Sequence, residues 1–186
     1  MNCNNCSFPN GRKMFLDLVE QLGEIHKRGC VLGNISRDHI KQDRHGNWTI
    51  LSSKNCYRQG ESVNPVADYI GWKNQSRAPE YRRACLRGND YYPTMAGDIY
   101  ELAYSIYEIL VGTSPRLNFQ LNRQWARQLE GAFACDSEQK KAALQSLFDK
   151  CTQMSEHHRI QTCWQLKGTE EFQLIFSDVE NDSSVK

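Results

Sequence analysis

The sequence predicts a mainly α-helical domain that also contains a few short β-strands. Apolar residues recur at helical spacing from 13 to 28, and Gly29 then follows as a typical helix stop. The stretch 98–112 is apolar on more than one face, which is typical of a helix buried at the centre of a domain. Helical spacing returns clearly at 138–153. These three stretches predict a helical core.

Short strands are predicted between the first two helices. Residues 30–32 form an apolar run, and residues 48–51 follow a Gly-Asn pair that favours a tight turn. Residues 52–77 are polar, rich in turn residues and without a clear period, which indicates a long loop. Loops of this length without secondary structure are usually functional or mobile.

Two weaker helices are predicted in the second half of the chain. One spans 118–130 and contains Trp125, and a last helix includes Trp164, Leu166 and Phe172. Because aromatic residues at helical spacing usually pack inward, Trp125 and Trp164 are expected in the core.

The chain length of 186 residues is typical of one compact domain. We expect this domain at 13–176, between a polar tail at 1–12 and a polar, acidic tail at 177–186. The apolar content of 39% is sufficient for a substantial core.

Charge and cysteine content exclude several classes of protein. The 23 basic and 22 acidic residues nearly balance, so neither a nucleic-acid partner nor a membrane partner is indicated. The eight cysteines are scattered and too sparse for a disulfide scaffold, which favours a reducing compartment. The sequence shows no signal peptide and no apolar run long enough to span a membrane. We therefore expect a soluble, cytoplasmic protein.

Five landmarks occur in one order along the chain, and they resemble those of the C-terminal lobe of eukaryotic protein kinases. The resemblance covers roughly 14 to 172, from the helix before the catalytic loop to the last helix. The landmarks are IHKRGCVLGN with His26, HGNWTILSS, the tripeptide Ala78-Pro79-Glu80, the helix that begins near Asp98, and EHHRIQT with Arg159.

The resemblance implies structural roles for three charged residues. Glu80 and Arg159 would form a planar ion pair that joins the long loop to the late helices. Asp98 would cap the central helix and would also hold the catalytic loop in place. The alternative is an ordinary surface salt bridge and an ordinary helix cap.

The groups needed for phosphoryl transfer are absent from the aligned positions. The kinase family places an aspartate base, a lysine, a metal-binding asparagine and a second metal-binding aspartate there. An asparagine amide cannot replace a carboxylate base, and an imidazole is a poor ligand for magnesium. We therefore expect no catalysis, no metal and no cofactor. The degenerate positions are Asn34, Ser36, His39 and Ser52.

Two further features bear on catalysis. A shifted alignment would make Asp38, one residue before His39, a metal ligand. Only 12 residues precede the first predicted helix, whereas a kinase N-terminal lobe of five strands and one helix needs roughly 55 to 60. We therefore expect no glycine-rich phosphate loop and no N-terminal lobe.

Cysteine and histidine groups have functional and structural interpretations. Cys3-x-x-Cys6 has the spacing of half a zinc site, but no matching second pair follows, so free thiols in a tail are the favoured interpretation. Cys30 and His26 are a conceivable nucleophile and base, although both fall at packing positions. Capping and packing also account for the remaining group, His157, His158 and Cys163.

A cluster of arginines surrounds the Ala-Pro-Glu tripeptide. It is either a solvated basic face or a surface that receives an acidic segment of a protein partner. The residues of this cluster are Arg77, Arg82, Arg83 and Arg87.

The predicted function is therefore that of an inactive kinase-lobe mimic, which binds an intact kinase or a kinase partner and regulates signalling. Truncated kinase-like proteins of some viruses resemble this description, which would place the protein in the host cytoplasm. One alternative is a noncatalytic scaffold that binds a nonkinase helical partner. Another is a residual phosphotransferase that depends on a partner.

Overall fold

The computed structural model describes residues 10–51, 56–64, 76–112 and 129–182, with side chains as far as Ser177. No helix in these ranges is long and apolar enough to cross a membrane. The helices are α1 (Gly11–Lys27), α2 (Pro79–Arg87), α3 (Met95–Val111), α5 (Glu138–Cys151), α6 (Cys163–Lys167) and α7 (Glu170–Asp182), with 3₁₀ turns η1 (Arg37–His39) and η2 (Glu156–His158). The strands are β1 (Cys30–Val31), β2 (Ile40–Gln42), β3 (Trp48–Ile50) and β4 (Tyr57–Arg58).

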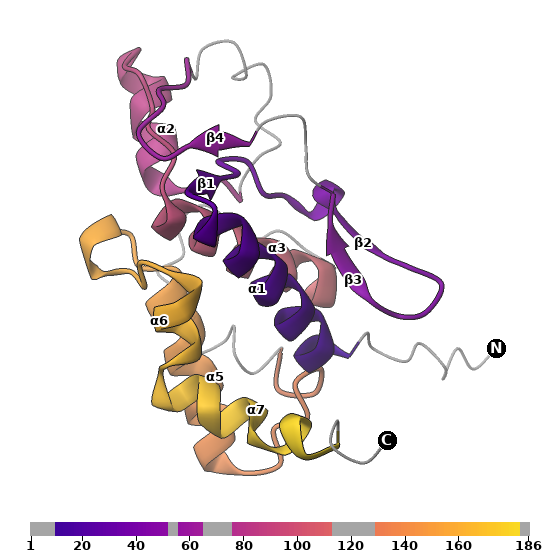
Figure 1. The fold of residues 1–186 in the computed structure, drawn as a ribbon. Coiled ribbons are helices and arrows are strands. Elements are labelled where there is room, and N and C mark those ends of the chain that lie inside the picture. Colours follow the sequence, from indigo (N-terminus) through magenta and orange to yellow (C-terminus); the bar gives the residue numbers. More distant parts are fainter. Residues whose placement is uncertain (1–9, 52–55, 65–75, 113–128, 183–186) are drawn as a thin grey trace, which may run out of the picture.

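Helix α3 is the centre of the fold (Figure 1). It begins after Thr94, whose hydroxyl accepts a hydrogen bond from the Gly97 amide, and it ends at Gly112 in the left-handed region. Buried residues lie on all of its sides, including the polar residues Asp98 and Glu101. The buried central helix predicted from the sequence is therefore present, and it starts three residues before Asp98.

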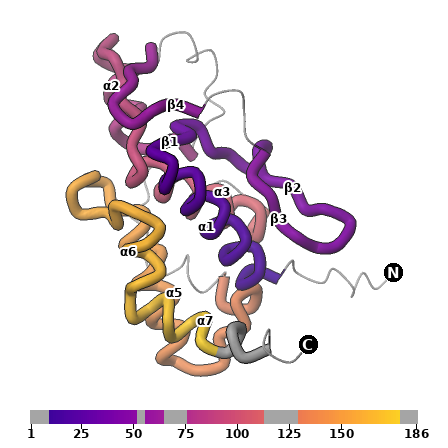
Figure 2. Tube along the Cα trace, viewed as in Figure 1, coloured from indigo at the N-terminus to yellow at the C-terminus, as the bar shows by residue number. Residues whose placement is uncertain are grey.

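Helices α5, α6 and α7 pack beside α1, on the side away from the strands (Figure 2). An aromatic cluster joins these helices. The ring of Phe15 on α1 lies within 6.3 Å of four other phenylalanine rings, measured between centroids: Phe133, Phe148, Phe172 and Phe176. All five side chains are buried, and such aromatic pairs add to the stabilisation from apolar burial.

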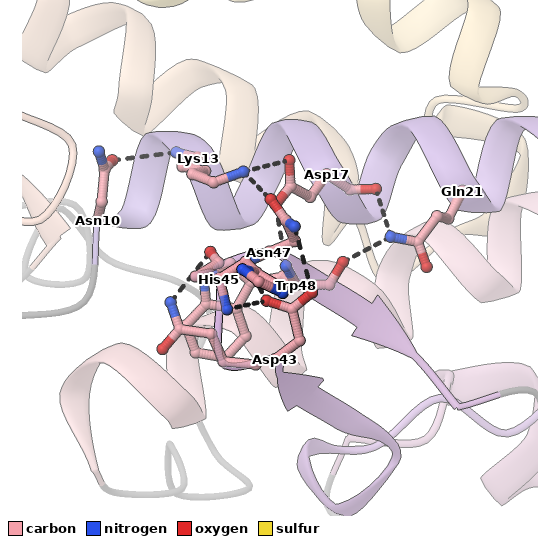
Figure 3. Close-up of polar contacts among 10 residues, drawn as sticks. Asn10, Lys13, Asp17, Gln21, Asp43, His45, Asn47 and Trp48 are labelled. Carbon is pink, nitrogen blue, oxygen red and sulfur yellow. Dashed lines mark hydrogen bonds and ion pairs between the residues drawn. The ribbon is translucent and has the colours of Figure 1, made fainter.

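The strands form two small antiparallel pairs. Strand β1 pairs with β4, with Val31 opposite Tyr57. Strand β2 pairs with β3, with Ile40 opposite Ile50. In the β2–β3 turn, the Asp43 carboxylate accepts amide hydrogen bonds from His45 and Asn47, which fixes the hairpin (Figure 3).

Two polar side chains of α1 bind the open edge of β3 (Figure 3). The Asp17 carboxylate accepts from the Trp48 amide at 2.9 Å. The Gln21 amide donates to the Trp48 carbonyl at 2.6 Å and accepts from the Ile50 amide at 3.1 Å. Because these bonds replace those of a third strand, they satisfy the edge and fix the hairpin against α1.

The observed elements differ from the predictions in three places. Strand β4 lies inside the segment predicted as a continuous loop, because its pairing with β1 supplies bonds that no local pattern reveals. The predicted last helix is two helices, since α6 ends at Gly168. Helix α7 then continues through Asp182, into the range expected as a tail.

Trp164 was predicted in the core, and this prediction is wrong: the residue is 86% exposed. Its helix α6 has only five residues and buries Cys163 and Leu166, so Trp164 lies on the outer face. The predicted helix at 118–130 lies mostly outside the described residues, as do Trp125, Ser52, Cys3 and Cys6.

Candidate functional site

The site begins with the loop between β1 and β2, which the sequence resemblance assigned to the catalytic loop of kinases. Its backbone is held by the buried Asp98 of α3. One carboxylate oxygen accepts from the Leu32 amide at 2.8 Å and the other from the Gly33 amide at 2.7 Å. Asp98 was predicted both to cap α3 and to hold this loop: Thr94 is the cap, so the first role is wrong, whereas the contact with the loop is present.

His26 is a third partner of Asp98. Its Nε2 lies 3.0 Å from the Asp98 carboxylate, and its Nδ1 lies 3.7 Å from the thiol of Cys163. The pKa of Cys163 is raised to about 12, mainly by burial and to a smaller extent by the nearby Asp98 carboxylate. This thiol is therefore buried and protonated, and the arrangement is a packed junction between α1, α3 and α6.

The proposed pairing of Cys30 with His26 is not found in the described residues. Cys30 donates weakly to the Arg28 carbonyl and lies against the thiol of Cys56. The pKa of Cys56 is raised to about 11, mainly by partial burial and to a smaller extent by this contact with Cys30. The His26 ring is instead in contact with Asp98 and Cys163.

Glu101, one turn after Asp98, is a site residue that the sequence analysis missed. One carboxylate oxygen accepts from the Ile35 amide at 2.8 Å. The other accepts from the Ala78 amide at 3.2 Å and lies 3.0 Å from the Arg77 Nε. Helix α3 thus fixes both the β1–β2 loop and the segment that leads into α2.

The electrostatics at Glu101 involve opposing effects. Complete burial raises the pKa of its carboxyl to about 7, and the Arg77 guanidinium acts in the opposite direction. The adjacent Asp98 carboxylate adds to the upward shift. Glu101 is therefore a buried group whose charge changes near neutral pH.

Arg77 was assigned to a surface basic cluster, and the structure corrects this assignment. The residue is buried, because it pairs with Glu101 and its guanidinium stacks 3.5 Å above the centre of the Tyr81 ring. The other three arginines of the cluster are on α2: Arg82 is half-buried, whereas Arg83 and Arg87 are exposed.

Glu80 and Arg159 lie in contact, as the resemblance implied. The Arg159 Nη1 is 2.8 Å from one Glu80 oxygen, and Nη2 is 3.1 Å from the other. Arg159 also donates to the carbonyls of Gln153 and Ala96, and its side chain is fully buried. The ion pair connects the start of α2 with the η2–α6 segment.

The positions that the resemblance aligns with the phosphoryl-transfer groups carry amide, hydroxyl and imidazole side chains. Asn34 is half-buried, and the Ser36 hydroxyl lies 3.3 Å from the Nδ1 of His39. Asp38 projects away, with its side chain 89% exposed and 4.0 Å from Arg37. Ser52 lies outside the described residues.

Within the described ranges, no three His, Cys, Asp or Glu side chains are grouped so that they could hold a metal ion. His157 and His158 are exposed on η2, whereas Cys163 is buried against His26. These three residues therefore do not form a common site.

Comparison with solved structures finds protein kinases. A rhoptry antigen kinase domain of Toxoplasma gondii matches with a TM-score of 0.66 and 18% identity, over 99% of this chain and 50% of its own. ROP2 of the same organism, described as a virulence factor with a protein-kinase fold and no enzymatic activity, matches with a TM-score of 0.64 and 17% identity. This chain has a fold like the C-terminal lobe of protein kinases.

The matches cover only part of each solved kinase. The match to ROP2 covers 94% of this chain and 46% of ROP2. The kinase PK-1 of Cydia pomonella granulovirus matches with a TM-score of 0.59 and 13% identity, over 92% of this chain and 63% of its own. The kinase-fold chain thus spans about half the length of the Toxoplasma structures. No protein-family model and no curated protein matches its sequence.

Proposed function

We propose that this kinase-fold chain is a binding protein that does not transfer phosphate, and that it regulates signalling by associating with an intact kinase or a kinase partner. One observation carries the proposal. The β1–β2 loop is held by Asp98 and Glu101 in a fixed position, yet the aligned catalytic position is occupied by the amide of Asn34.

The chemistry of the loop supports inactivity. Phosphoryl transfer requires a carboxylate to orient the attacking hydroxyl and oxygen ligands for magnesium. Asn34 cannot accept a proton, and Ser36 has no positive charge to offer a phosphate. His39, whose Nδ1 is next to the Ser36 hydroxyl, supplies a nitrogen where the kinase family has an amide oxygen.

The packing supports a role in binding and not in catalysis. Two buried ion pairs, Arg77–Glu101 and Glu80–Arg159, fix the segment that leads into α2. Neither pair needs a phosphorylated residue or a nucleotide. The described part of the segment that leads into α2 is therefore held by contacts within the chain, and such preorganisation favours a competitor for kinase contacts.

Affinity capture with purified intact kinases tests the proposed partner. The immobilised chain should retain at least one kinase and should change the phosphate transfer rate of that kinase. Recovery of nonkinase proteins that bind through a helix would instead favour the scaffold alternative. If the chain retains no kinase and no protein known to contact one, the regulatory proposal fails.

The phosphotransferase alternative makes a different prediction. If Asp38 or another improvised group held magnesium, ATP with magnesium would raise the melting temperature by mass action. The proposal predicts no shift, with or without the captured partner. A shift that the variant Asp38→Asn abolishes would support the alternative.

A further inference from the structure

Helix α2 has a firmly anchored inner side. Pro79 and Tyr81 are buried, and the Tyr81 ring packs edge-on against Tyr91 at 5.1 Å between centroids. Glu80, the acidic residue of this helix, is held by Arg159. The helix ends at Gly88, which is in the left-handed region with φ of 64°. The orientation of the outer side is therefore fixed.

The outer side combines positive charge with an exposed apolar residue. Arg83, Leu86 and Arg87 are spaced so that they share one helix face, and all three are exposed. Leu86 is 76% exposed. Among the described residues, neither Arg83 nor Arg87 forms an ion pair, and the same holds for Arg82.

The charge on this face is a local excess. The whole chain has a net charge of only +1, so the excess does not reflect a generally basic protein. With Glu80 engaged by Arg159, the exposed Asp90 is the next acidic residue along the chain. Among the described residues of α2, three arginines without an ion pair therefore lie within four residues of Leu86.

We infer that Arg83, Leu86 and Arg87 form a docking face for an acidic segment of a partner protein, in which carboxylates flank one apolar side chain. Arginine binds carboxylates through two parallel hydrogen bonds, which gives direction as well as attraction. Leu86 would bury its side chain between these contacts, where burial stabilises most. The inference deepens the proposed function by naming the chemistry of the partner.

A protein segment fits this face better than a nucleic acid does. A phosphate backbone would use the arginines, but it has no apolar group to cover Leu86. The two occupants differ in a measurable way. The affinity for a nucleic acid would fall steeply with added salt and would not change when Leu86 is substituted. The affinity for the peptide would fall both with added salt and when Leu86 is substituted.

The probe is an array of short, fluorescently labelled acidic peptides in which one central residue is Leu, Phe, Ser or Gln. Fluorescence anisotropy with the full chain should show binding to peptides with Leu or Phe and weaker binding to those with Ser or Gln. Leu86→Ser and the double variant Arg83→Gln/Arg87→Gln should each weaken binding about tenfold or more.

Matched controls come from other exposed positions. Met154→Ser removes another exposed apolar side chain, and Lys41→Gln/Arg44→Gln removes two exposed charges from the β2–β3 hairpin. Both should bind like the unmodified chain, and unchanged melting temperatures will show that the α2 variants fold. The inference is overturned if all variants bind equally or if no peptide binds. It is also overturned if a single-stranded oligonucleotide binds as tightly as the peptides and its binding is unaffected by Leu86→Ser.

The two proposals fail separately. If the chain captures a kinase through a surface that α2 variants do not affect, the docking face is wrong and the proposed function stands. If the chain transfers phosphate, the proposed function is wrong and the docking face is unaffected.

Discussion

Glu80 and Arg159, which are far apart in the sequence, meet through two hydrogen bonds of 2.8 and 3.1 Å. The Arg159 side chain is fully buried and the Glu80 side chain nearly so. The same guanidinium also donates to the Ala96 carbonyl of α3 and lies 4.9 Å from the centre of the Tyr100 ring. One arginine therefore ties the start of α2 to the central helix and to the late helices.

Removal of Arg159 should destabilise the fold strongly. The variant Arg159→Met leaves Glu80 with an unpaired, mostly buried charge, which costs about 3 to 5 kcal/mol in the free energy of unfolding. Denaturation by urea measures this cost. Lys150→Met is the control, because the Lys150–Glu171 pair is much more exposed. It should cost less than about 1 kcal/mol, and equal costs for the two variants would contradict the structural role of Arg159.

The carboxylate of Asp98 should protect the amides of the β1–β2 loop. Asp98→Asn keeps the shape of the side chain, but its neutral amide can accept only through one oxygen, whereas the carboxylate accepts from both Leu32 and Gly33. Loss of charge-assisted bonds of about 1.5 to 3 kcal/mol should speed hydrogen exchange at these amides by roughly tenfold or more. Asp38→Asn, at an exposed position, should leave exchange there unchanged.

Glu101 should make stability depend on pH. Its pKa is about 7 in the folded chain and close to 4.5 in an unfolded one. Between these values the folded state holds more protons, so raising the pH lowers the free energy of unfolding, by on the order of 3 kcal/mol across the window. This contribution is fully present below about pH 4.5 and is lost as the pH rises through about 7.

The variant Glu101→Gln isolates this effect because glutamine does not titrate. Urea denaturation at several pH values should show the stability of the unmodified chain falling relative to that of the variant from about pH 4.5 to about pH 7. Above this window the difference should level off. A stability difference that stays constant would show that folding does not change the pKa of Glu101. A difference that grows with pH would show that folding lowers this pKa.

Long helices and the fold class could be predicted from the sequence, because periodic apolar residues determine them locally. The three strongest helices lie within a few residues of their predicted ends. Resemblance also placed Glu80, Asp98 and Arg159, since the motifs around them occur in a fixed order. Strand β4 could not be predicted, because a two-residue strand is defined by its partner β1 and not by its own sequence.

The role of Glu101 was missed because a glutamate in a helix normally indicates the solvent side. One signal was available: the run around it is apolar on more than one face, and a charged residue in a buried helix of this kind needs a partner. Arg77 was placed on the surface with its sequence neighbours, although it precedes α2 and points inward to Glu101.

The measurement that tests the central claim most directly is phosphate transfer from ATP labelled at its γ-phosphate. The chain would be assayed with magnesium, with general protein substrates, and with its captured partner in an inactivated form. The account predicts no label on the chain, the substrates or the partner above a sample without the chain. Label that increases with the amount of chain and disappears in Asp38→Asn would contradict it, whereas a contaminating kinase would label both preparations equally.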